Sequence, residues 1–423
     1  MGEHTDEIVV VGAGAVGATI AYELGRAGLS VRLVDSGEGP GGGCSYANAG
    51  LLTPNYVEPL ATVENVRLGL RYLFAPKSPF RLSPHPSLVP WLASFVASAR
   101  PGRAALMTER LQAMARYSLA LHLAYPEQGV DTGVRRTGSL DAWTTPEGWE
   151  KARDELPEDT RMDAEQVAEV FPGLHGVQGG VFHEEDATCN TLQYVTAMVE
   201  AAQAHGVTVQ WGTRVEQVRE EDGRVAEVTL SDGTRCQPRQ LVLAAGLGTG
   251  ALCEQLGLRM PLKPATGYVV DVPHGPSTPP HPVMLKELKV VLTPLADRMR
   301  AAGTLDLSAQ PGRSKADRLE SVREVAQEAM PDFAWDDPID TWAGDRPCTS
   351  DGMPVIGASR HVEGLVVAAG HGMWGMMLAP ITAEWVLRGL TGDPSALSDP
   401  AMSPDRFTHL RRRPTSRGGD RAA

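Results

Sequence analysis

The stretch VVVGAGAVGATIAYELGRAGLSVRLVD, residues 9–35, decides the fold of this chain. A run of branched apolar residues over 8–11 predicts a buried strand, and apolar residues at helical spacing over 15–27 predict a helix directly after it. The turn between them carries three glycines in the pattern GxGxxG, which are Gly12, Gly14 and Gly17. The glycines are therefore predicted to lie at a strand-to-helix turn.

A turn of this kind is typical of a site for a dinucleotide. The tight bend, the close approach of a pyrophosphate to the backbone, and close helix-to-strand packing each exclude a side chain. The N–H groups at the start of the helix then face the phosphates. A second strand is predicted over 30–34, and Asp35 at its end stands about 20 residues past the glycines, where it can accept hydrogen bonds from an adenosine ribose. An acid at this position disfavours a 2′-phosphate.

Composition restricts the class of protein further. The chain has 423 residues, of which 42% are hydrophobic, so two or three domains with sizeable cores are expected. Its net charge of −13 argues against a nucleic-acid partner. The five cysteines form no CxxC pair, so neither a metal site nor a disulfide framework is predicted. With no signal peptide and no apolar run of about 18 residues, we expect a soluble, cytoplasmic α/β protein.

The strand-then-glycine design occurs twice more along the chain. A buried strand over 241–245 is followed by Gly246, and a strand over 365–369 is followed by Gly370-His371-Gly372 and a helix to about residue 388. Three such junctions can surround one long ligand. Further strands are predicted over 207–211, 268–272, 283–292 and 302–308, helices over 193–204 and 315–330, and hairpin turns at 222–223 and 232–233.

Two segments near the first junction have open roles. Residues 44–56 are polar and rich in Gly and Pro, and they follow the second strand of the nucleotide fold, where loops reach the ligand. Residues 66–99 mix apolar and aromatic residues with prolines and basic residues. This second segment either packs in the core of another domain or rests on a membrane surface or partner.

Five motifs in order give the chain a family resemblance. They are GxGxxG with Asp35, SYANAG (45–50), LVLAAG (241–246), DRPCTSDGMPVIG (345–357) and GHGMWGM (370–376). Together they resemble the FAD-dependent D-amino-acid oxidase superfamily, most closely the bacterial D-amino-acid dehydrogenases, over nearly the whole chain to about residue 410. The resemblance implies an α/β fold in which a Rossmann-like FAD-binding domain is interleaved with a substrate domain built on a mixed sheet. The implied boundaries are 1–57, 175–258 and 340–410 for the FAD-binding domain and 58–174 and 259–339 for the substrate domain.

The resemblance also implies which residues hold FAD, without a covalent bond. They lie in the first turn, after the second strand, in the segment that passes the flavin, in the middle junction and in the last turn. These residues are Gly12, Gly14, Ala15, Val16, Gly17, Asp35, Ser36, Ser45, Asn48, Ala49, Gly50, Leu51, Val215, Ala245, Gly246, Gly370, His371, Gly372, Met373 and Gly375. The helix after the last turn would direct its N-terminus at the edge of the flavin where negative charge develops on reduction.

Four residues match the substrate side of the family's site. Arg346 matches the arginine that binds the substrate carboxylate, although an ordinary ion pair is the alternative. Tyr56 and Tyr268 match tyrosines near the substrate, or pack at the domain interface. His371 has either a chemical role or only a hydrogen bond within its turn. The chain departs from the family at Thr266, where a lysine is usual, and at Trp374, which is bulkier than usual. Both departures concern the substrate pocket and not FAD binding.

The implied reaction is oxidative deamination of an amino acid, most simply a D-amino acid. Hydride would pass from the α-carbon to flavin N5, and the imine would hydrolyse to a 2-oxo acid and ammonia. A quinone or another acceptor would then take the electrons. Two alternatives stay open: an oxidase of glycine, sarcosine or proline-type amines that forms peroxide, and a flavin-carrying subunit without amine chemistry. The basic tail, 411–423, is predicted to be disordered or to contact an anionic membrane from the cytoplasmic side.

Overall fold

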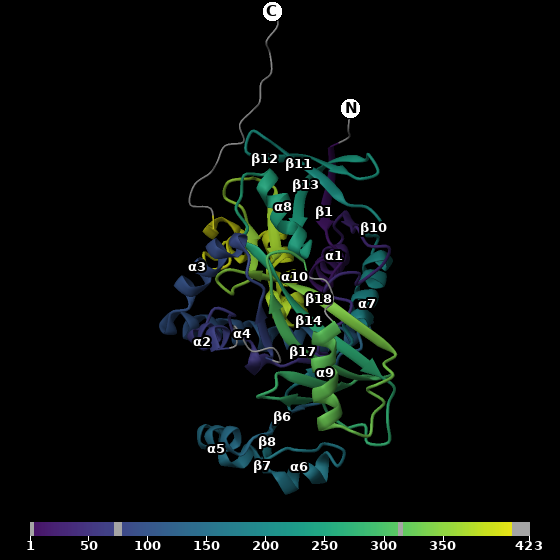
Figure 1. Ribbon diagram of the computed structural model, residues 1–423. Helices are drawn as coiled ribbons and strands as arrows, with labels where there is room; N and C mark the ends of the chain where they lie inside the picture. Colours follow the sequence, from purple (N-terminus) through teal and green to yellow (C-terminus); the bar gives the residue numbers. More distant parts are fainter. Residues whose placement is uncertain (1–3, 72–77, 312–315, 408–423) are drawn as a thin grey trace, which may run out of the picture.

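The structure is a computed structural model that describes residues 4–71, 78–311 and 316–407 (Figure 1). The basic tail predicted over 411–423 lies outside the described residues. A parallel sheet with its helices occupies the upper part of Figure 1, and a second sheet lies below it. No helix in the described ranges is long and apolar enough to cross a membrane.

The upper sheet contains the predicted nucleotide-binding fold. In the described part of the chain it has eight strands, five of which are parallel, in the order β10 (Thr208–Gln210), β2 (Val31–Val34), β1 (His4–Val11), β13 (Arg235–Leu243) and β20 (Leu365–Ala369). Three antiparallel strands complete the sheet in the described residues. The strand β19 (Val355–Ala358) pairs with β20, and β12 (Arg224–Leu230) pairs with the first residues of β13 and with β11 (Val215–Glu221). Because β1, β13 and β20 run parallel, the three glycine junctions meet at one edge of the sheet, as the sequence predicts.

Helices cover this sheet on both faces. On one face lie α1 (Ala15–Arg26), α7 (Thr191–Ala204), α10 (Gly375–Thr391) and α4 (Pro101–Ala124). On the other lies α8 (Thr249–Gln255), which packs against side chains of the sheet that include those of β11 and β12. Successive residues of β1 alternate between the two cores, so Val10 packs under α1 while Val9 and Val11 pack toward α8. A strand buried on both faces must be apolar throughout, which explains its continuous valine run.

The lower sheet holds nine of the described strands. Their order is β18 (Asp340–Thr349), β14 (Leu262–Val272), β17 (Met299–Leu307), β16 (Val290–Pro294), β15 (Val283–Leu285), β6 (Ser139–Trp143), β8 (Gly179–His183) and β7 (Arg161–Asp163), with β4 (Phe80–Leu82) beside β17. Helix α9 (Ala316–Ala329) packs on one face, and α5 (Pro146–Glu155) and α6 (Ala164–Val170) lie at the far end (Figure 1). A small sheet links the layers and consists of β3 (Leu51–Leu52), β9 (Ala187–Thr188) and β5 (Arg135–Arg136).

Two details of the lower sheet differ from the sequence prediction. The single strand predicted over 283–292 is wrong, because the chain reverses between β15 and β16 through Lys289, which has a φ of 53°. No Gly or Asn marks that turn, so the sequence gives no signal for it. Strands β8 and β18 fall within the boundaries predicted for the FAD-binding domain, yet both pair in the lower sheet. A strand's partners depend on long-range packing that local pattern does not contain.

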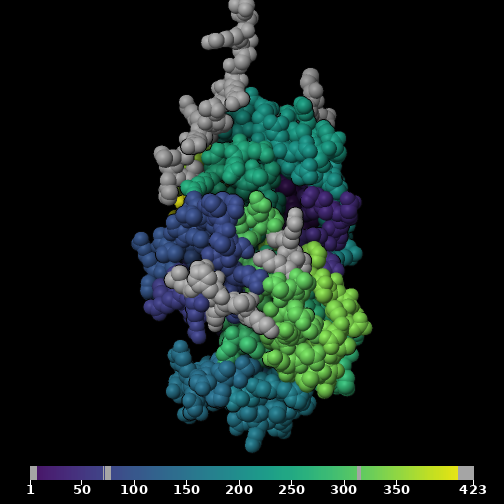
Figure 2. All heavy atoms as spheres, in the orientation of Figure 1, coloured from purple at the N-terminus to yellow at the C-terminus, as the bar shows by residue number. Residues whose placement is uncertain are grey.

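The described part of the segment 66–99, which leaves out residues 72–77, packs partly in the core, and its contact with a membrane surface or partner stays a prediction. It contains α2 (Val63–Arg71) and α3 (Val89–Ser98), in the blue part of Figure 2. Trp91 is 3% exposed and stacks on Phe95 at 5.2 Å between ring centroids, in a small apolar cluster with Ala265 of β14. Val89 and Val96 of the same helix are 63% and 56% exposed. One face of α3 is therefore core, and the other faces solvent.

Candidate active site

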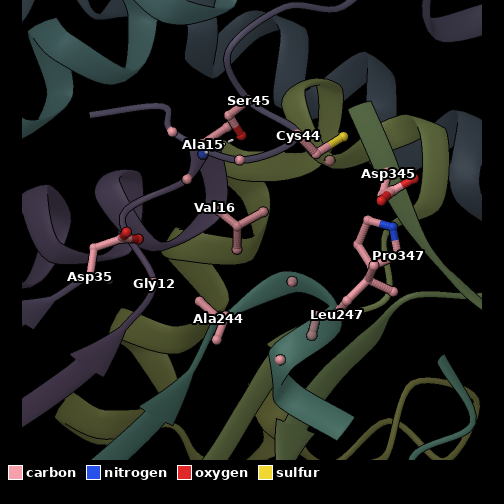
Figure 3. Close-up of a pocket in the computed structure, with 18 of the residues that line it drawn as sticks. Gly12, Ala15, Val16, Asp35, Cys44, Ser45, Ala244, Leu247, Asp345 and Pro347 are labelled. Atoms are coloured by element: carbon pink, nitrogen blue, oxygen red, sulfur yellow. Dashed lines mark hydrogen bonds between the residues drawn. The ribbon is translucent and has the colours of Figure 1, made fainter. Parts of the chain in front are cut away.

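A cavity of about 930 Å³ lies at the carboxyl edge of the parallel sheet. This is near the upper end of the range of about 300–1,000 Å³ that is usual for small-molecule sites. Figure 3 shows Gly12 and Asp35 at one end of it and Asp345 and Pro347 at the other. The cavity thus extends from the nucleotide fold to strand β18 of the lower sheet.

Most of the predicted cofactor residues line this cavity, and so does Arg346. The predicted residues that it brings together are Gly12, Gly14, Ala15, Val16, Asp35, Ser36, Ser45, Asn48, Val215, Ala245, Gly246, Gly370, His371, Gly372, Met373 and Gly375. Six predicted residues lie outside the lining, namely Gly17, Ala49, Gly50, Leu51, Tyr56 and Tyr268.

The three glycines of the first turn have different tasks. A Cβ on Gly17 would stand 1.8 Å from the carbonyl oxygen of Gly12, and a Cβ on Gly12 would stand 2.5 Å from that of Ala244. Both glycines therefore allow close backbone packing between β1, α1 and β13. A Cβ on Gly14 would meet only Ser45, with Oγ at 3.1 Å. Gly14 thus leaves space inside the cavity, as expected where a pyrophosphate approaches the backbone.

The side chains of Asp35 and Ser45 accept hydrogen bonds from backbone N–H groups at the rim of the cavity. The N–H of Ala13 donates to Asp35 Oδ2 at 2.6 Å, and the N–H of Gly37 donates to Oδ1 at 2.7 Å. The N–H of Ala15, at the start of α1, donates to Ser45 Oγ at 3.1 Å. Each carboxylate oxygen has two acceptor positions, so Asp35 keeps capacity for the predicted ribose hydroxyls.

Hydrogen bonds to the lower sheet and to the small sheet hold the segment 48–51 in place. Thr191 Oγ1 and the N–H of Gly50 both donate to Asn48 Oδ1, at 2.5 and 2.8 Å. Thr293 of β16 donates to the carbonyl of Ala49 at 2.6 Å, and Leu51 pairs with Thr188. These contacts position Asn48 in the lining while Ala49, Gly50 and Leu51 act as its support.

The last glycine turn brings the start of α10 to the cavity. Gly375 and Met376, the first two residues of the helix, are in the lining. His371 is buried, and burial lowers its pKa to about 4, so its imidazole is neutral near pH 7. Thr382 Oγ1 donates to the carbonyl of Leu378 at 2.7 Å and lies 3.1 Å from His371 Nε2. Since the hydroxyl proton is engaged, His371 Nε2 carries its own proton and donates it to Thr382.

Arg346 reaches the cavity from β18 with its guanidinium above Gly267 of β14. A Cβ on Gly267 would stand 2.1 Å from Arg346 Nη2 and 2.4 Å from Cζ. Within residues 4–71, 78–311 and 316–407, no hydrogen bond or ion pair engages this guanidinium. The alternative, that Arg346 forms an ordinary ion pair, therefore has no support among the described residues. A half-buried cation that lines a cavity without a carboxylate partner is suited to an anionic ligand.

A distortion of β17 marks the same place. Opposite Gly267, β17 has one extra residue between its pairings with Thr266 and Tyr268. Thr304, in this bulge, is buried with a φ of 59°, which is rare for a β-branched residue. Bulges and strained residues of this kind are frequent beside active sites.

The two predicted tyrosines lie elsewhere. Tyr268 alternates with Gly267 on β14 and so points to the opposite face of the sheet, into the core under α9. Its hydroxyl donates to Asp306 at 3.2 Å, and burial raises its pKa. Tyr56 lies in a short helix, 54–56, where Lys286 Nζ stands 4.1 Å from its ring centroid. A role for Tyr56 in substrate contact stays a prediction, whereas the position of Tyr268 favours the packing alternative.

Several lining residues were missed by the sequence prediction. Trp342 and Gly344 share the face of β18 that carries Arg346, since alternate residues of a strand point the same way. Asp345, also in the lining, accepts a hydrogen bond from the buried Thr266 at 2.5 Å. Cys44 borders the cavity beside Ser45 (Figure 3). Alternation along a strand could have indicated Trp342, four residues before Arg346, but no strand over 340–349 is predicted from the sequence.

Cys348 has the properties of a structural thiol. It is 3% exposed, and burial raises its pKa to about 12. Because the thiolate is the nucleophilic form, a thiol of this pKa is unreactive at neutral pH. This supports the prediction that FAD is bound without a covalent bond.

The lining fits the predicted cofactor. Gly14 leaves room for a pyrophosphate at the start of α1, Asp35 is placed for a ribose, and the start of α10 faces the other end. In between, the wall is apolar, with Val16 on one side and Ala244 and Leu247 on the other (Figure 3). Apolar walls with a few placed polar groups are what a large, flat cofactor requires.

Known proteins show the same pattern. Residues 7–388 match the family described as FAD dependent oxidoreductase. A D-amino acid dehydrogenase from Paramagnetospirillum magneticum is 32% identical over 420 residues, covering 95% of this chain and 99% of the relative. A D-amino acid dehydrogenase from Rhizobium johnstonii is 29% identical over 399 residues, covering 90% and 94%.

Solved structures share the fold. A glycine oxidase from Bacillus cereus has a TM-score of 0.71 at 19% identity, covering 97% of this chain and 99% of its own. An L-proline dehydrogenase from P. horikoshii has a TM-score of 0.72 at 20% identity, covering 96% and 99%. With the family match and the lining described above, the chain belongs to the family of FAD-dependent oxidoreductases, and FAD is its cofactor.

Proposed function

We propose that this enzyme is a D-amino-acid dehydrogenase, which oxidises a D-amino acid to a 2-oxo acid and ammonia. The observation that carries the proposal is the guanidinium of Arg346, which lines the cavity above Gly267. Its planar fork can donate two parallel hydrogen bonds to a carboxylate. The relatives named D-amino acid dehydrogenase support the choice of substrate.

The chain's own residues mainly bind and orient in this reaction. Arg346 would fix the carboxylate, and so place the α-carbon between β18 and the cofactor. His371 is neutral and donates to Thr382, so it holds the turn rather than moving a proton. FAD, when bound, would supply the acceptor for the hydride, one proton with two electrons, that the α-carbon loses, and water would hydrolyse the resulting iminium ion to the 2-oxo acid and ammonia. Orientation and exclusion of water are the protein's share of such a reaction.

Arg346→Ala and Arg346→Lys test the proposal. The alanine variant should keep FAD and lose about 30-fold to several thousand-fold in kcat/KM with D-amino acids, as expected when one member of a desolvated charge pair is removed. The lysine variant should recover part of this, because an ammonium group lacks the fork. Arg136, whose exposed side chain pairs with the exposed Glu185, provides the matched control for loss of an arginine.

The substrate panel decides the class of the donor. Anaerobic bleaching of the flavin should occur with D-amino acids and be slow with L-amino acids, glycine and N-methyl amines. An amino-acid amide should be a poor substrate and lose little in the alanine variant, since it has no anionic carboxylate. Equal losses for acid and amide, or a normal kcat/KM in Arg346→Ala, would refute the role of Arg346.

We also propose that the electrons leave to a quinone-type acceptor, at a membrane surface that α3 contacts. The names of the relatives as dehydrogenases support the quinone-type acceptor, and the exposed Val89 and Val96 support the membrane contact.

Two measurements test this proposal. A soluble quinone or dye should be reduced faster than oxygen. Binding to vesicles with anionic lipid should weaken in Val89→Asp/Val96→Asp while dye reduction is unchanged. Rapid stoichiometric peroxide release would instead indicate an oxidase.

A further inference from the structure

Trp342 and Arg346 stand on the same face of β18, with Gly344 between them. In the neighbouring strand, Gly267 pairs directly with Gly344. Two paired glycines thus separate the tryptophan from the arginine. Since neither glycine has a side chain, the guanidinium of Arg346 can lie over Gly267 and the indole of Trp342 can reach over Gly344.

The indole ring of Trp342 is held in place on its far side. It packs against the ring of Tyr46 at 4.5 Å between centroids, and it belongs to an apolar cluster with Val269 and Ala302 of the adjoining strands. Tyr46 is fixed in turn, because its hydroxyl donates to Asp340 Oδ2 at 2.9 Å. The ring therefore presents a defined edge to the cavity that it lines.

That edge carries the indole N–H. A Cβ on Gly344 would stand 3.0 Å from Trp342 Nε1, so the nitrogen lies above Gly344, on the side of Arg346. Nε1 is buried, and in the part of the chain that the structure describes it has no hydrogen-bond acceptor. A buried indole N–H usually has a partner, since leaving one unsatisfied is costly. The cavity side is the direction from which a ligand can supply it.

We propose that the indole N–H of Trp342 is a second donor to the substrate carboxylate, acting together with Arg346. This inference rests on the proposed function. An indole N–H is a donor only, so its partner must be an acceptor, and the strongest acceptor of an amino acid is its anionic carboxylate, the group that Arg346 would bind. A carboxylate accepts about four hydrogen bonds, which is enough for the two from the guanidinium and one from the indole. Because Gly267 and Gly344 have no side chains, the guanidinium and the indole both lie over this strand pair and border the same part of the cavity, where one carboxylate can accept from both.

Trp342→Phe tests the inference, because phenylalanine keeps a ring against Tyr46 and removes the N–H. The probe is benzoate, an unreactive carboxylate, titrated into the FAD-loaded enzyme and followed by the change in flavin absorbance. Since a hydrogen bond to a charged group is lost, the Kd for benzoate should rise about 10-fold or more. The KM for the best D-amino acid should rise by a similar factor, with a smaller change in kcat. The absorption spectrum of the ligand-free enzyme should be unchanged.

Two comparisons separate this role from a structural one. Tyr46→Phe removes the hydroxyl that binds Asp340 but keeps the ring stacked on Trp342, and its Kd for benzoate should stay within about 2-fold of wild type. In the double variant Arg346→Lys/Trp342→Phe, the two losses should be non-additive, because both donors serve one carboxylate.

The inference is wrong if Trp342→Phe binds benzoate as tightly as wild type. It is also wrong if the variant shifts the spectrum of the ligand-free flavin and leaves the benzoate Kd unchanged, since the indole then serves the cofactor. Failure of the proposed function looks different: wild type and Arg346→Ala would then bind benzoate equally, and no D-amino acid would bleach the flavin. That outcome would overturn both.

Discussion

Gly267 and Arg346 share one volume, because the guanidinium occupies the space in which a side chain at position 267 would stand. The two residues lie on adjacent strands, β14 and β18, at a diagonal across the sheet. The conformation of the arginine therefore depends on the absence of a side chain on its neighbour. With the proposed role of Arg346, Gly267 would determine substrate binding without contacting the substrate.

Gly267→Ala should displace the guanidinium of Arg346 and leave FAD bound. The kcat/KM for D-amino acids should fall at least about 10-fold, because a displaced guanidinium loses its hydrogen bonds to the substrate carboxylate. Steady-state kinetics and the flavin absorbance per protein measure both effects. Gly275→Ala is the control, since the nearest atom to its new Cβ would be 3.4 Å away, an ordinary contact. A wild-type KM in Gly267→Ala would show that the arginine has another productive position.

Gly14→Val should abolish FAD binding while the chain still folds, because Gly14 leaves space in the cavity and its Cβ would meet only Ser45. Gly17→Val should fail to fold, since even its Cβ would stand 1.8 Å from the backbone of Gly12. Flavin content after purification and circular dichroism distinguish the two outcomes. Stoichiometric flavin in Gly14→Val would mean that the pyrophosphate lies elsewhere.

Tyr268→Phe should leave the KM for D-amino acids within about 2-fold of wild type, since the side chain faces α9 on the opposite side of the sheet from Arg346. The variant should lose about 1–3 kcal/mol of unfolding free energy, because the buried Asp306 loses a donor. Urea unfolding and steady-state kinetics provide the two readouts. A large rise in KM with unchanged stability would instead place this tyrosine at the substrate.

His371 should make stability depend on pH. Burial lowers its pKa from 6.5 to about 4, so between these values the unfolded chain binds a proton that the folded chain does not. Stability is therefore lost as the pH falls, by about 2 kcal/mol for this group between pH 8 and pH 5. Urea unfolding of wild type and His371→Gln at both pH values measures the difference.

The comparison with the variant is needed because another group acts in the opposite direction. Burial raises the pKa of Asp186 to about 6, so the folded chain takes up that proton first and gains stability as the pH falls. Asp186 is unchanged in His371→Gln, and its contribution cancels in the difference. Equal pH dependence in wild type and variant would show that the pKa of His371 is the same in the folded and the unfolded chain.

The parallel sheet could be predicted because its signals are local. Its central strands are buried on both faces, so each is a short apolar run, and each junction needs glycines at fixed positions. The hairpin of β15 and β16 was missed since its turn depends on Lys289, a residue that no turn rule selects. The positions of Tyr56 and Tyr268 relative to the cavity could not be predicted either, because they depend on how segments far apart in sequence pack together.

The sequence by itself determined the nucleotide fold, the family and the set of segments that surround the cofactor, because glycine spacing, apolar runs and motif order are properties of neighbouring residues. Only the tertiary structure decided which face of β18 lines the cavity, and with it the grouping of Trp342, Gly344 and Arg346 around Gly267. The physical reason is that side chains of a strand alternate between two faces. Which face becomes the site depends on the sheet's packing against α9 on one side and the 44–50 segment on the other.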